Sequence, residues 1–330
     1  MAISEHHNAS GHTGLMTLLA VKRIIAALVC LLNFGSSGVQ AGTAEGWTAF
    51  EARDYEKAFT EWSKSAEQGD AVAERNLGYL YEAGEGVARD DTKASAWYRR
   101  AAEHGNAEAQ LNLGNNFADG RGVSKDLNLA IHWLSKAAEQ GNASAQFNLA
   151  LKFHHQESLR DLAKAAIWYR KAADQDHANA QVNLATLYNN GDGVAQDYAA
   201  ALALYRKADA QDNAVAARYL GNMYERGAGV AVDNGEAMRF YRRAATLGDY
   251  EALMILAFRY RDGEIVKQDL ARAHVYACLA EQSPARVAEE GLSVAEFKQV
   301  LWQRMAQEQR AESERLLQSH SETGELPSGP

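Results

Sequence analysis

The chain has 330 residues, of which 47% are hydrophobic and 23% are charged, and its formal net charge is −9. This composition is that of a folded protein and excludes a chain that is disordered throughout. The negative charge argues against a nucleic-acid partner, because nucleic-acid-binding proteins normally present a basic patch or stripe.

Residues 1–41 have the pattern of a secretory signal peptide preceded by a polar extension. Lys22 and Arg23 form a basic segment, and an apolar run of eleven residues follows from Ile24 to Phe34. This run is shorter than the roughly 20 residues that a helix needs to cross a bilayer. We expect translation to start at Met16, cleavage to occur near Ala41, and a periplasmic or secreted chain without a transmembrane anchor.

The two cysteines give little further information. Cys30 lies inside the apolar run, after Val29 rather than after a small residue, which argues against a lipid anchor at this position. Signal cleavage leaves Cys278 alone, so the exported chain has no intramolecular disulfide framework. Cys278 falls in a helical pattern, and we expect it to be a small side chain of the core.

Residues 42–69 predict a short pair of helices. Trp47 and Phe50 give one apolar face, Asp54 is a plausible helix cap, and Tyr55 and Trp62 recur at helical spacing in the second helix. We expect this pair to cap the N-terminal end of the structure that follows.

From residue 70 onward, one short phrase returns at a nearly fixed spacing. It reads NAEAQLNLG from Asn106, NASAQFNLA from Asn142, HANAQVNLA from His177 and NAVAARYLG from Asn213, and looser copies start at residues 70 and 249. The steps between these starts are 36, 36, 35, 36 and 36 residues. A period of this length indicates a solenoid of stacked units. The six expected units are 70–105, 106–141, 142–176, 177–212, 213–248 and 249–282.

Each unit predicts two helices joined by a glycine loop. In the first unit, the first helix covers residues 71–83, the loop Gly84 to Arg89 follows, and the second helix begins at Asp90 and stops at Gly105. An aspartate recurs where each second helix starts, and we expect it to cap that helix rather than to bind metal: Asp90, Asp126, Asp161, Asp197, Asp233 and Asp269. A large side chain recurs further along, and we expect it to fill the space between units: Trp97, Trp133, Trp168, Leu204, Phe240 and Tyr276.

This repeated pattern resembles the Sel-like repeat (SLR), a relative of the tetratricopeptide repeat. The residues that carry the resemblance include WYRKAA from Trp168 to Ala173, and Asp192-Gly193-Val194 followed by Asp197. The resemblance covers about residues 70–281 and implies an all-α fold, an α/α superhelical solenoid of six helix-turn-helix SLR units between N-terminal and C-terminal capping helices. It also implies a role in assembling proteins rather than in catalysis. Bacterial members of the family are often exported and serve in envelope maintenance, exopolysaccharide control or host contact.

Two units depart from the pattern. The third unit has His154 to Leu159 in place of the glycine loop and is one residue shorter, and the last unit has Ile265 at the second glycine position. His154, His155 and Glu157 are residue types that bind transition metals. Because neighbours in sequence seldom converge on one ion, we favour a solvated loop over a metal site.

Residues 283–317 predict capping helices. Ser293 and Glu296 form a capping box that opens an amphipathic pattern running through Phe297 and Leu301 to Leu317. A terminal helix of this kind covers the exposed face of the last unit of a solenoid. Residues 318–330 are polar, and we expect them to be a disordered tail.

The first helix of each unit has a second stripe, opposite the side that faces the core. In the first unit it consists of Val72, Arg75, Tyr79 and Glu82. Two rows repeat along the units and would line the concave surface of a superhelix; we call them the partner stripe. One row is Arg75, Leu111, Phe147, Val182, Arg218 and Met254, and the other is Tyr79, Asn115, Leu151, Thr186, Asn222 and Phe258.

Exposed aromatic and arginine side chains are typical interface anchors, which favours a protein or peptide ligand on the partner stripe. The alternative is that superhelical curvature buries these side chains between units, and the sequence does not decide between the two. A third row, Asn76, Asn112, Asn148 and Asn183, suits either an extended peptide backbone or hydrogen bonds between helices. For this row we favour the structural interpretation.

The sequence contains none of the common catalytic motifs, such as S-x-x-K, G-x-S-x-G, H-E-x-x-H or a Walker loop. We expect no enzyme activity, no cofactor and no metal. Some exported relatives with disulfides resemble penicillin-binding or penicillin-hydrolysing proteins, but the mature chain lacks paired cysteines. Our interpretation is an exported protein-interaction scaffold with a partner in the cell envelope. The alternative is a module that binds cell-wall or other polysaccharide, and a β-lactam-binding or β-lactam-hydrolysing enzyme is a third, less favoured class.

Overall fold

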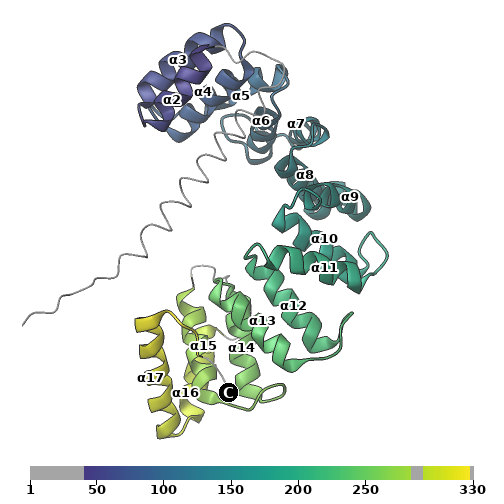
Figure 1. Ribbon diagram of the computed structural model, residues 1–330, viewed down its shortest axis with the longest axis vertical. Coiled ribbons are helices and arrows are strands. Elements are labelled where there is room, and N and C mark those ends of the chain that lie inside the picture. The colour runs from purple at the N-terminus through teal and green to yellow at the C-terminus, as the bar shows by residue number, and fades with distance from the viewer. Residues whose placement is uncertain (1–40, 284–292, 328–330) are drawn as a thin grey trace, which may run out of the picture. The chain divides into compact units, whose positions relative to one another are not determined.

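The computed structural model describes residues 41–283 and 293–327 (Figure 1). Within these ranges every regular element is helical: sixteen α-helices, labelled α2 to α17, and one short 3-10 helix, η1. The expectation of an all-α fold is therefore confirmed. Residues 1–40, with most of the expected signal peptide, and residues 284–292, near the start of the expected capping segment, lie outside the described residues.

The chain divides into two compact parts, with the division between Ala130 and Ile131. We call these two parts the first and the second unit, and each helix pair of the solenoid a repeat. The first contains α2 (Ala41–Glu51), α3 (Tyr55–Glu67), α4 (Ala71–Ala83), α5 (Asp91–Glu103) and α6 (Ala107–Asp119). Helix α7 (Leu127–Glu139) spans the division. The second contains α8 (Ala143–His155), η1 (Glu157–Leu159), α9 (Leu162–Ala173), α10 (Ala178–Asn190), α11 (Tyr198–Asp209), α12 (Ala214–Arg226), α13 (Asn234–Thr246), α14 (Tyr250–Asp262), α15 (Leu270–Gln282), α16 (Val294–Arg304) and α17 (Gln307–Thr323).

In the first unit, consecutive helices from α2 to α6 pack against one another in chain order. The core around α3 contains Trp62, whose indole Nε1 donates to the carbonyl of Thr43 at 3.2 Å. Ala58, Leu77 and Leu80 are buried beside it. The helix pair that we expected at residues 42–69 is therefore present as α2 and α3.

In the second unit, consecutive helices from α8 onward also pack in chain order, and the end of the chain folds back onto α15. Helix α15 contacts α14, α16 and α17, and Ala273, Tyr276 and Ala277 on it are fully buried. No helix among the described residues has the length and the apolar composition to span a membrane.

The expected aspartate caps are all present. For example, Asp90 Oδ1 accepts hydrogen bonds from the amides of Thr92 and Lys93 at 3.1 and 3.0 Å. Asp126, Asp161, Asp197, Asp233 and Asp269 make equivalent bonds at the starts of α7, α9, α11, α13 and α15. Each carboxylate satisfies amides that have no partner within the helix, so the repeat fixes where every second helix begins.

The second glycine of the loop brings two stretches of backbone together. Gly122 has φ +63°, and a Cβ atom there would lie 1.8 Å from the carbonyl oxygen of Asp91, at the start of α5. Only glycine fits this position, because both its backbone conformation and its neighbour exclude a side chain. In the third repeat, which lacks this glycine, α8 ends at His155 and η1 replaces the open loop.

The large side chains at the expected position of the second helices are buried in some repeats, as at Trp133, Phe240 and Tyr276, but in other repeats the ring one residue further along is the buried one. Tyr98, Tyr169 and Tyr205 are fully buried, whereas Trp97 and Trp168 remain partly exposed. A cation lies over the ring of each tryptophan at the expected position. The Arg100 guanidinium lies 4.6 Å from the ring centroid of Trp97, and equivalent lysine contacts occur at Trp133 and Trp168.

The C-terminal segment is more ordered than the sequence predicts. The capping box of Ser293 and Glu296 is present and opens α16. Helix α17 continues to Thr323, so the first residues of the expected disordered tail at 318–330 are helical, which corrects that expectation. The hydroxyl of Tyr276 donates to the carbonyl of Pro327 at 2.8 Å, and Leu326 packs against the core, which explains why this part of the chain is held.

Candidate partner-binding surface

The partner stripe lies on the first helix of each repeat because the other side of that helix is closed by its own second helix. In α4, Ala73 and Leu77 are fully buried, and a Cβ atom on Gly78 would lie 2.6 Å from the Tyr98 ring. This close packing leaves no room for a ligand on the core side. Any ligand that binds a first helix must therefore use the remaining side, where the partner stripe lies.

The two arginines of the partner stripe join successive repeats. Arg75 on α4 forms an ion pair with Glu108 on α6, the first helix of the next repeat. Arg218 on α12 forms ion pairs with Asp249 and Glu251 at the start of α14, again the first helix of the next repeat. The Arg218 Nε atom lies 3.0 Å from Asp249 Oδ1, and its side chain is largely buried. These charges fix one repeat against the next, so they are not isolated anchors for a partner.

Phe147 and Leu151 lie one turn apart on α8 and are half-buried. The Phe147 ring stacks on His177 at 4.6 Å between centroids, and it lies 6.0 Å from the ring of Tyr169. Both side chains pack against the core of the repeat while part of their surface stays accessible. They combine a structural role with a surface that a partner can contact.

Other positions of the partner stripe differ in how much surface they offer. Val182 is only 6% exposed and belongs to the core, so our inclusion of it as a contact residue was wrong. The alternative that we left open, burial between repeats, holds at this position. Leu111 and Asn115, on helix α6 of the second repeat, are half-buried.

Met254 and Phe258 on α14 are half-buried and pack against the C-terminal core. The Phe258 ring lies 4.9 Å from the ring of Phe297 on α16, and the guanidinium of Arg261 lies 4.9 Å from its centroid. Sequence reasoning on the repeat alone did not place α16 against this end of the partner stripe. These two residues therefore hold a capping helix.

Tyr79 is the most accessible member of the partner stripe. Its side chain is 40% exposed on α4, and its ring meets the edge of Phe50 at 5.8 Å. In the second unit, Thr186 shares a hydrogen bond of 2.9 Å with the hydroxyl of Tyr205. Asn222 forms a hydrogen bond with Tyr241, which opposes the rise in the pKa of that tyrosine caused mainly by burial.

Val72 and its equivalent in a later repeat are exposed residues that the partner stripe does not include. Val72 is 37% exposed on α4, and Val215 is 36% exposed at the same repeat position on α12. Val215 and Arg218 line a hollow of about 310 Å³ together with Tyr250 and Glu251. The repeat spacing from Val72 to Val215 was the signal that could have identified this row.

The asparagine row is structural at the positions where its contacts are resolved. Asn76 is buried, and its Oδ1 accepts from the Arg75 guanidinium at 2.9 Å. Asn183 forms a hydrogen bond with the Tyr169 hydroxyl, which partly offsets the effect of burial in raising the pKa of that group. These bonds agree with the structural interpretation rather than with a ladder for an extended peptide.

The histidines of the third repeat contact each other and the neighbouring second helix. The rings of His154 and His155 stack at 4.2 Å, and His154 Nδ1 lies 3.1 Å from the Tyr169 hydroxyl. Burial lowers the pKa of His154. Nowhere in the described residues do three or more His, Cys, Asp or Glu side chains converge in a way that could hold a metal ion.

Cys278 is buried on α15, as expected for a core side chain. Its sulfur lies 3.7 Å from His274 Nδ1, and the same nitrogen lies 2.9 Å from the hydroxyl oxygen of Ser313. Burial raises the pKa of the Cys278 thiol and lowers that of His274. Burial therefore favours the neutral forms of both groups inside the core.

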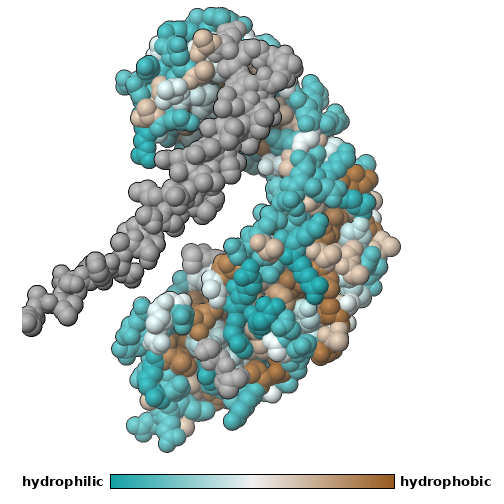
Figure 2. Space-filling view, in the orientation of Figure 1, coloured by the Kyte–Doolittle hydropathy of each residue, from teal (hydrophilic) through white to brown (hydrophobic). Residues whose placement is uncertain are grey.

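On the face of the molecule that Figure 2 shows, hydrophilic residues predominate and hydrophobic residues occur in small separate groups. This face has no single broad apolar area of the kind that marks an obligate interface.

Comparison with known proteins agrees with this architecture. The sequence model of the Sel1 repeat matches seven segments, at residues 48–70, 71–106, 107–142, 143–177, 178–213, 214–249 and 251–282. Six of these segments correspond to the six expected repeats. The remaining segment, residues 48–70, covers most of the helix pair at residues 42–69 that we expected to be an N-terminal cap.

Two solved structures are similar over most of the chain. A Sel1 repeat protein from Oxalobacter formigenes has 29% sequence identity and a TM-score of 0.67, and the match covers 76% of this chain and 100% of that one. A protective antigen of uropathogenic Escherichia coli strains, which displays an SLR fold, has 30% identity and a TM-score of 0.53, with coverage of 85% and 68%. A search of curated proteins found no match. The chain belongs to the Sel1 repeat family.

Proposed function

We propose that this chain is an exported scaffold that binds a protein or peptide partner in the cell envelope through the first helices of its repeats. The Sel1 repeat fold is typical of protein-interaction scaffolds, which supports the general class. Export rests on the sequence pattern of residues 1–41, and the accessible part of the partner stripe supports partner binding.

The observation that carries this proposal is the exposure of apolar side chains at equivalent positions in two repeats. Val72 and Tyr79 lie exposed on α4, and Val215 lies exposed on α12 beside the Arg218 hollow. Each side chain loses water-accessible apolar surface when a partner covers it, which stabilises the complex by roughly 25 cal/mol per Å². The adjoining ion pair of Arg218 and Glu251 supplies a polar rim.

The partner that fits these features presents separate apolar side chains rather than a broad apolar face. The hollow at Val215, with a volume of about 310 Å³, is large enough for one side chain of a partner. Leu151 on α8 offers a further half-buried apolar contact within the same unit. Separate apolar contacts of this kind suit single side chains of a protein or peptide partner.

A specific observation also favours glycan binding as a second candidate. A hollow of about 600 Å³ between the ends of α10 and α12 is lined by amides, including Asn189, Asn190, Gln196 and Asn222, with Tyr198 and Arg226 beside them. Side-chain amides offer both donors and acceptors to neighbouring hydroxyl groups, and an exposed tyrosine ring can pack on a sugar face. The chemistry of this hollow suits a neutral or weakly acidic saccharide.

The test is capture of partners from the envelope fraction of the source cell. The wild-type chain is compared with a variant in which Tyr79→Arg and Val215→Arg are combined, and with a control that carries Ile167→Arg. Ile167 is 53% exposed on α9, a second helix, so the control adds the same charge to an exposed apolar site away from the partner stripe.

We expect one stoichiometric protein to be captured by the wild type and by the control, and to be lost from the double variant. Binding of that protein, purified, must show the same order of affinities. Equal capture by all three chains would refute the assignment of the partner stripe. If no protein is captured and the chain is retained on purified peptidoglycan, the glycan candidate replaces the scaffold.

A further inference from the structure

The last residues that the structure describes, 324–327, form a short segment without regular structure that lies on the C-terminal core; we call it the strap. Gly324 ends α17 in the left-handed conformation, with φ +71°. The chain then turns inward, so that Leu326 packs against the C-terminal core and Pro327 is buried. The strap and the helices beneath it all belong to the second unit.

The strap supplies the hydrogen-bond partner of a buried hydroxyl group. Tyr276 on α15 is fully buried, and its hydroxyl donates to the carbonyl of Pro327 at 2.8 Å. The Tyr276 ring stacks on Tyr260 at 5.7 Å between centroids. Burial raises the pKa of Tyr276, and the nearby Arg242 and Arg272 oppose part of this rise. We call the surface of α15 around the Tyr276 hydroxyl the seat of the strap.

Tyr276 differs from the residues at the same position of the earlier repeats. Among the six members of this row, it is the one with a hydroxyl group; the others are Trp97, Trp133, Trp168, Leu204 and Phe240. Because a buried hydroxyl costs free energy unless it makes a hydrogen bond, a tyrosine at this position needs an acceptor. The carbonyl of Pro327 is that acceptor. The last repeat therefore departs from the others in a way that matches the strap.

Leu326 and Pro327 define the kind of segment that the seat accepts. Proline has no backbone N–H, so a buried proline leaves no donor without a partner, while its carbonyl can still accept a hydrogen bond. The residue before a proline is restricted to extended conformations, which reduces the conformational entropy that it loses on docking. An apolar side chain followed by proline therefore suits a seat of buried rings with one hydroxyl donor.

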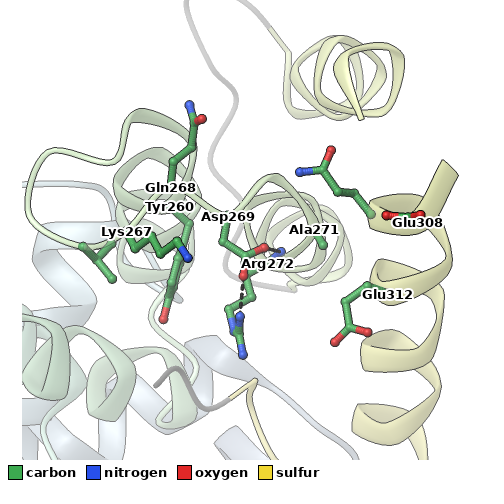
Figure 3. Close-up of a pocket in the computed structure, with 10 residues that line it drawn as sticks. Tyr260, Lys267, Gln268, Asp269, Ala271, Arg272, Glu308 and Glu312 are labelled. Atoms are coloured by element: carbon green, nitrogen blue, oxygen red, sulfur yellow. Dashed lines mark hydrogen bonds and ion pairs between the residues drawn. The ribbon is translucent and has the colours of Figure 1, made fainter. Parts of the chain in front are cut away.

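The C-terminal segment that carries the strap is held by few buried contacts. Residues 321–325 are exposed, and Ser313 is the one buried residue among the 17 of α17, all of which the structure describes. A hollow of about 430 Å³ separates the first turns of α17 from the loop that leads into α15. Figure 3 shows Glu308 and Glu312 of α17 across this hollow from Arg272. Segments with so few buried contacts open locally at a lower cost in free energy than the core.

We propose that the seat binds a segment of a partner protein in which leucine is followed by proline, and that the strap occupies this site in cis until such a segment displaces it. The carbonyl of the partner's proline accepts from the Tyr276 hydroxyl, and the partner's leucine takes the place of Leu326. Neither Tyr276 nor the strap belongs to the partner stripe, so this site is distinct from the proposed function and does not rest on it.

The test is fluorescence anisotropy of a labelled peptide with the sequence of residues 323–330, TGELPSGP. In the control peptide, TGESSSGP, serine replaces the leucine and the proline. Each peptide is added to the wild-type chain and to a strap variant, the full chain with Leu326→Ser and Pro327→Ser combined. We expect the strap variant to bind TGELPSGP at submillimolar concentration. The wild type should bind it about tenfold or more weakly, because the tethered strap competes at an effective concentration on the order of millimolar.

Matched tyrosine substitutions in the strap variant test the hydroxyl itself. Tyr276→Phe removes the donor and keeps the ring, and we expect it to weaken peptide binding about threefold to tenfold. Tyr98→Phe is the control, because it removes another fully buried hydroxyl, which donates to Glu82 at 2.6 Å in the first unit. We expect it to leave the affinity unchanged. Urea denaturation checks that each variant is folded, and Leu326→Ser alone provides a milder strap variant.

Four results would overturn the proposal. One is the absence of TGELPSGP binding by both strap variants at millimolar concentration. Another is equal binding of the two peptides, which would show that leucine and proline are not recognised. The third is unchanged affinity after Tyr276→Phe, which would place the peptide elsewhere. The fourth is equal binding by the wild type and the strap variant, which would show that the strap does not occupy the site. Each result stands whether or not the partner stripe captures a protein.

Discussion

Substituting Gly122 by alanine tests the role that the structure gives to the glycine loop. Gly122 has φ +63°, and an added Cβ atom would lie 1.8 Å from the carbonyl oxygen of Asp91 and 2.8 Å from the amide nitrogen of Thr92. The left-handed backbone costs a non-glycine residue roughly 1–2 kcal/mol. The clash with backbone atoms must be relieved by a shift of the loop, which costs about 1–3 kcal/mol more. The expected loss is therefore roughly 2–5 kcal/mol in the free energy of unfolding.

Gly105 provides the matched control for this substitution. It has φ +87°, yet a Cβ atom there would meet no atom within 4 Å. Gly105→Ala therefore carries only the backbone cost of roughly 1–2 kcal/mol. The difference between the two variants isolates the contact between the loop and the start of α5.

The assay is urea denaturation of both variants and the wild type, followed by circular dichroism. The comparison is made on the midpoint and on the slope, because a change in slope would show that cooperativity among the repeats has changed. We expect Gly122→Ala to lower the midpoint clearly more than Gly105→Ala. Equal losses for the two variants would refute the reasoning, since the close approach at Asp91 would then have no energetic consequence.

Three further predictions concern the caps, the buried amides and pH. Asp197→Ala should lower the free energy of unfolding by about 1 kcal/mol, because the amide of Ala200 loses its acceptor at 2.9 Å, and urea denaturation measures the loss. Gln146→Leu should cost about 1 kcal/mol by the same measurement, because its Nε2 donates to the carbonyl of Ala138 at 3.0 Å inside the core; no loss would show that the bond is dispensable. Burial lowers the pKa of His274 below its ordinary value of 6.5, so the unfolded chain binds a proton there at higher pH than the folded one. The stability contributed by the neutral ring is present above about pH 6.5 and is lost as the pH falls towards the folded-state pKa. Thermal unfolding between pH 7 and pH 5 should therefore show a steeper loss for the wild type than for His274→Gln, and parallel curves would contradict this.

The parts of the fold that depend on local chemistry could be predicted from the sequence. The aspartates that start each second helix, such as Asp90, act within three residues of their own position, so their role can be inferred without knowledge of the packing. The first helix of the first repeat, expected over residues 71–83, has these bounds in the structure. The capping box of Ser293 and Glu296 is a local motif of the same kind.

Features that depend on distant packing could not be predicted in this way. The repeat pattern places Val182 on the same helical face as Arg75, yet Val182 is in the core and Arg75 is not. The same periodicity did not reveal that Phe297 would cover Phe258, because α16 is not part of the repeat. The repeat pattern also did not reveal that Trp97 stays partly exposed while Tyr98 is fully buried, because adjacent residues lie about 100° apart around a helix and the packing decides which ring faces the core.

The most direct test of the scaffold account is the dissociation constant of the captured partner, purified, for the wild type, Val215→Arg and Ile167→Arg. Val215 lies on the first helix α12 beside the Arg218 hollow, and Ile167 lies exposed on the second helix α9. The account predicts that Val215→Arg weakens binding by about tenfold or more, because a charge is buried in an apolar contact, while Ile167→Arg leaves the affinity unchanged. Equal affinities for all three chains, or a loss confined to Ile167→Arg, would contradict it.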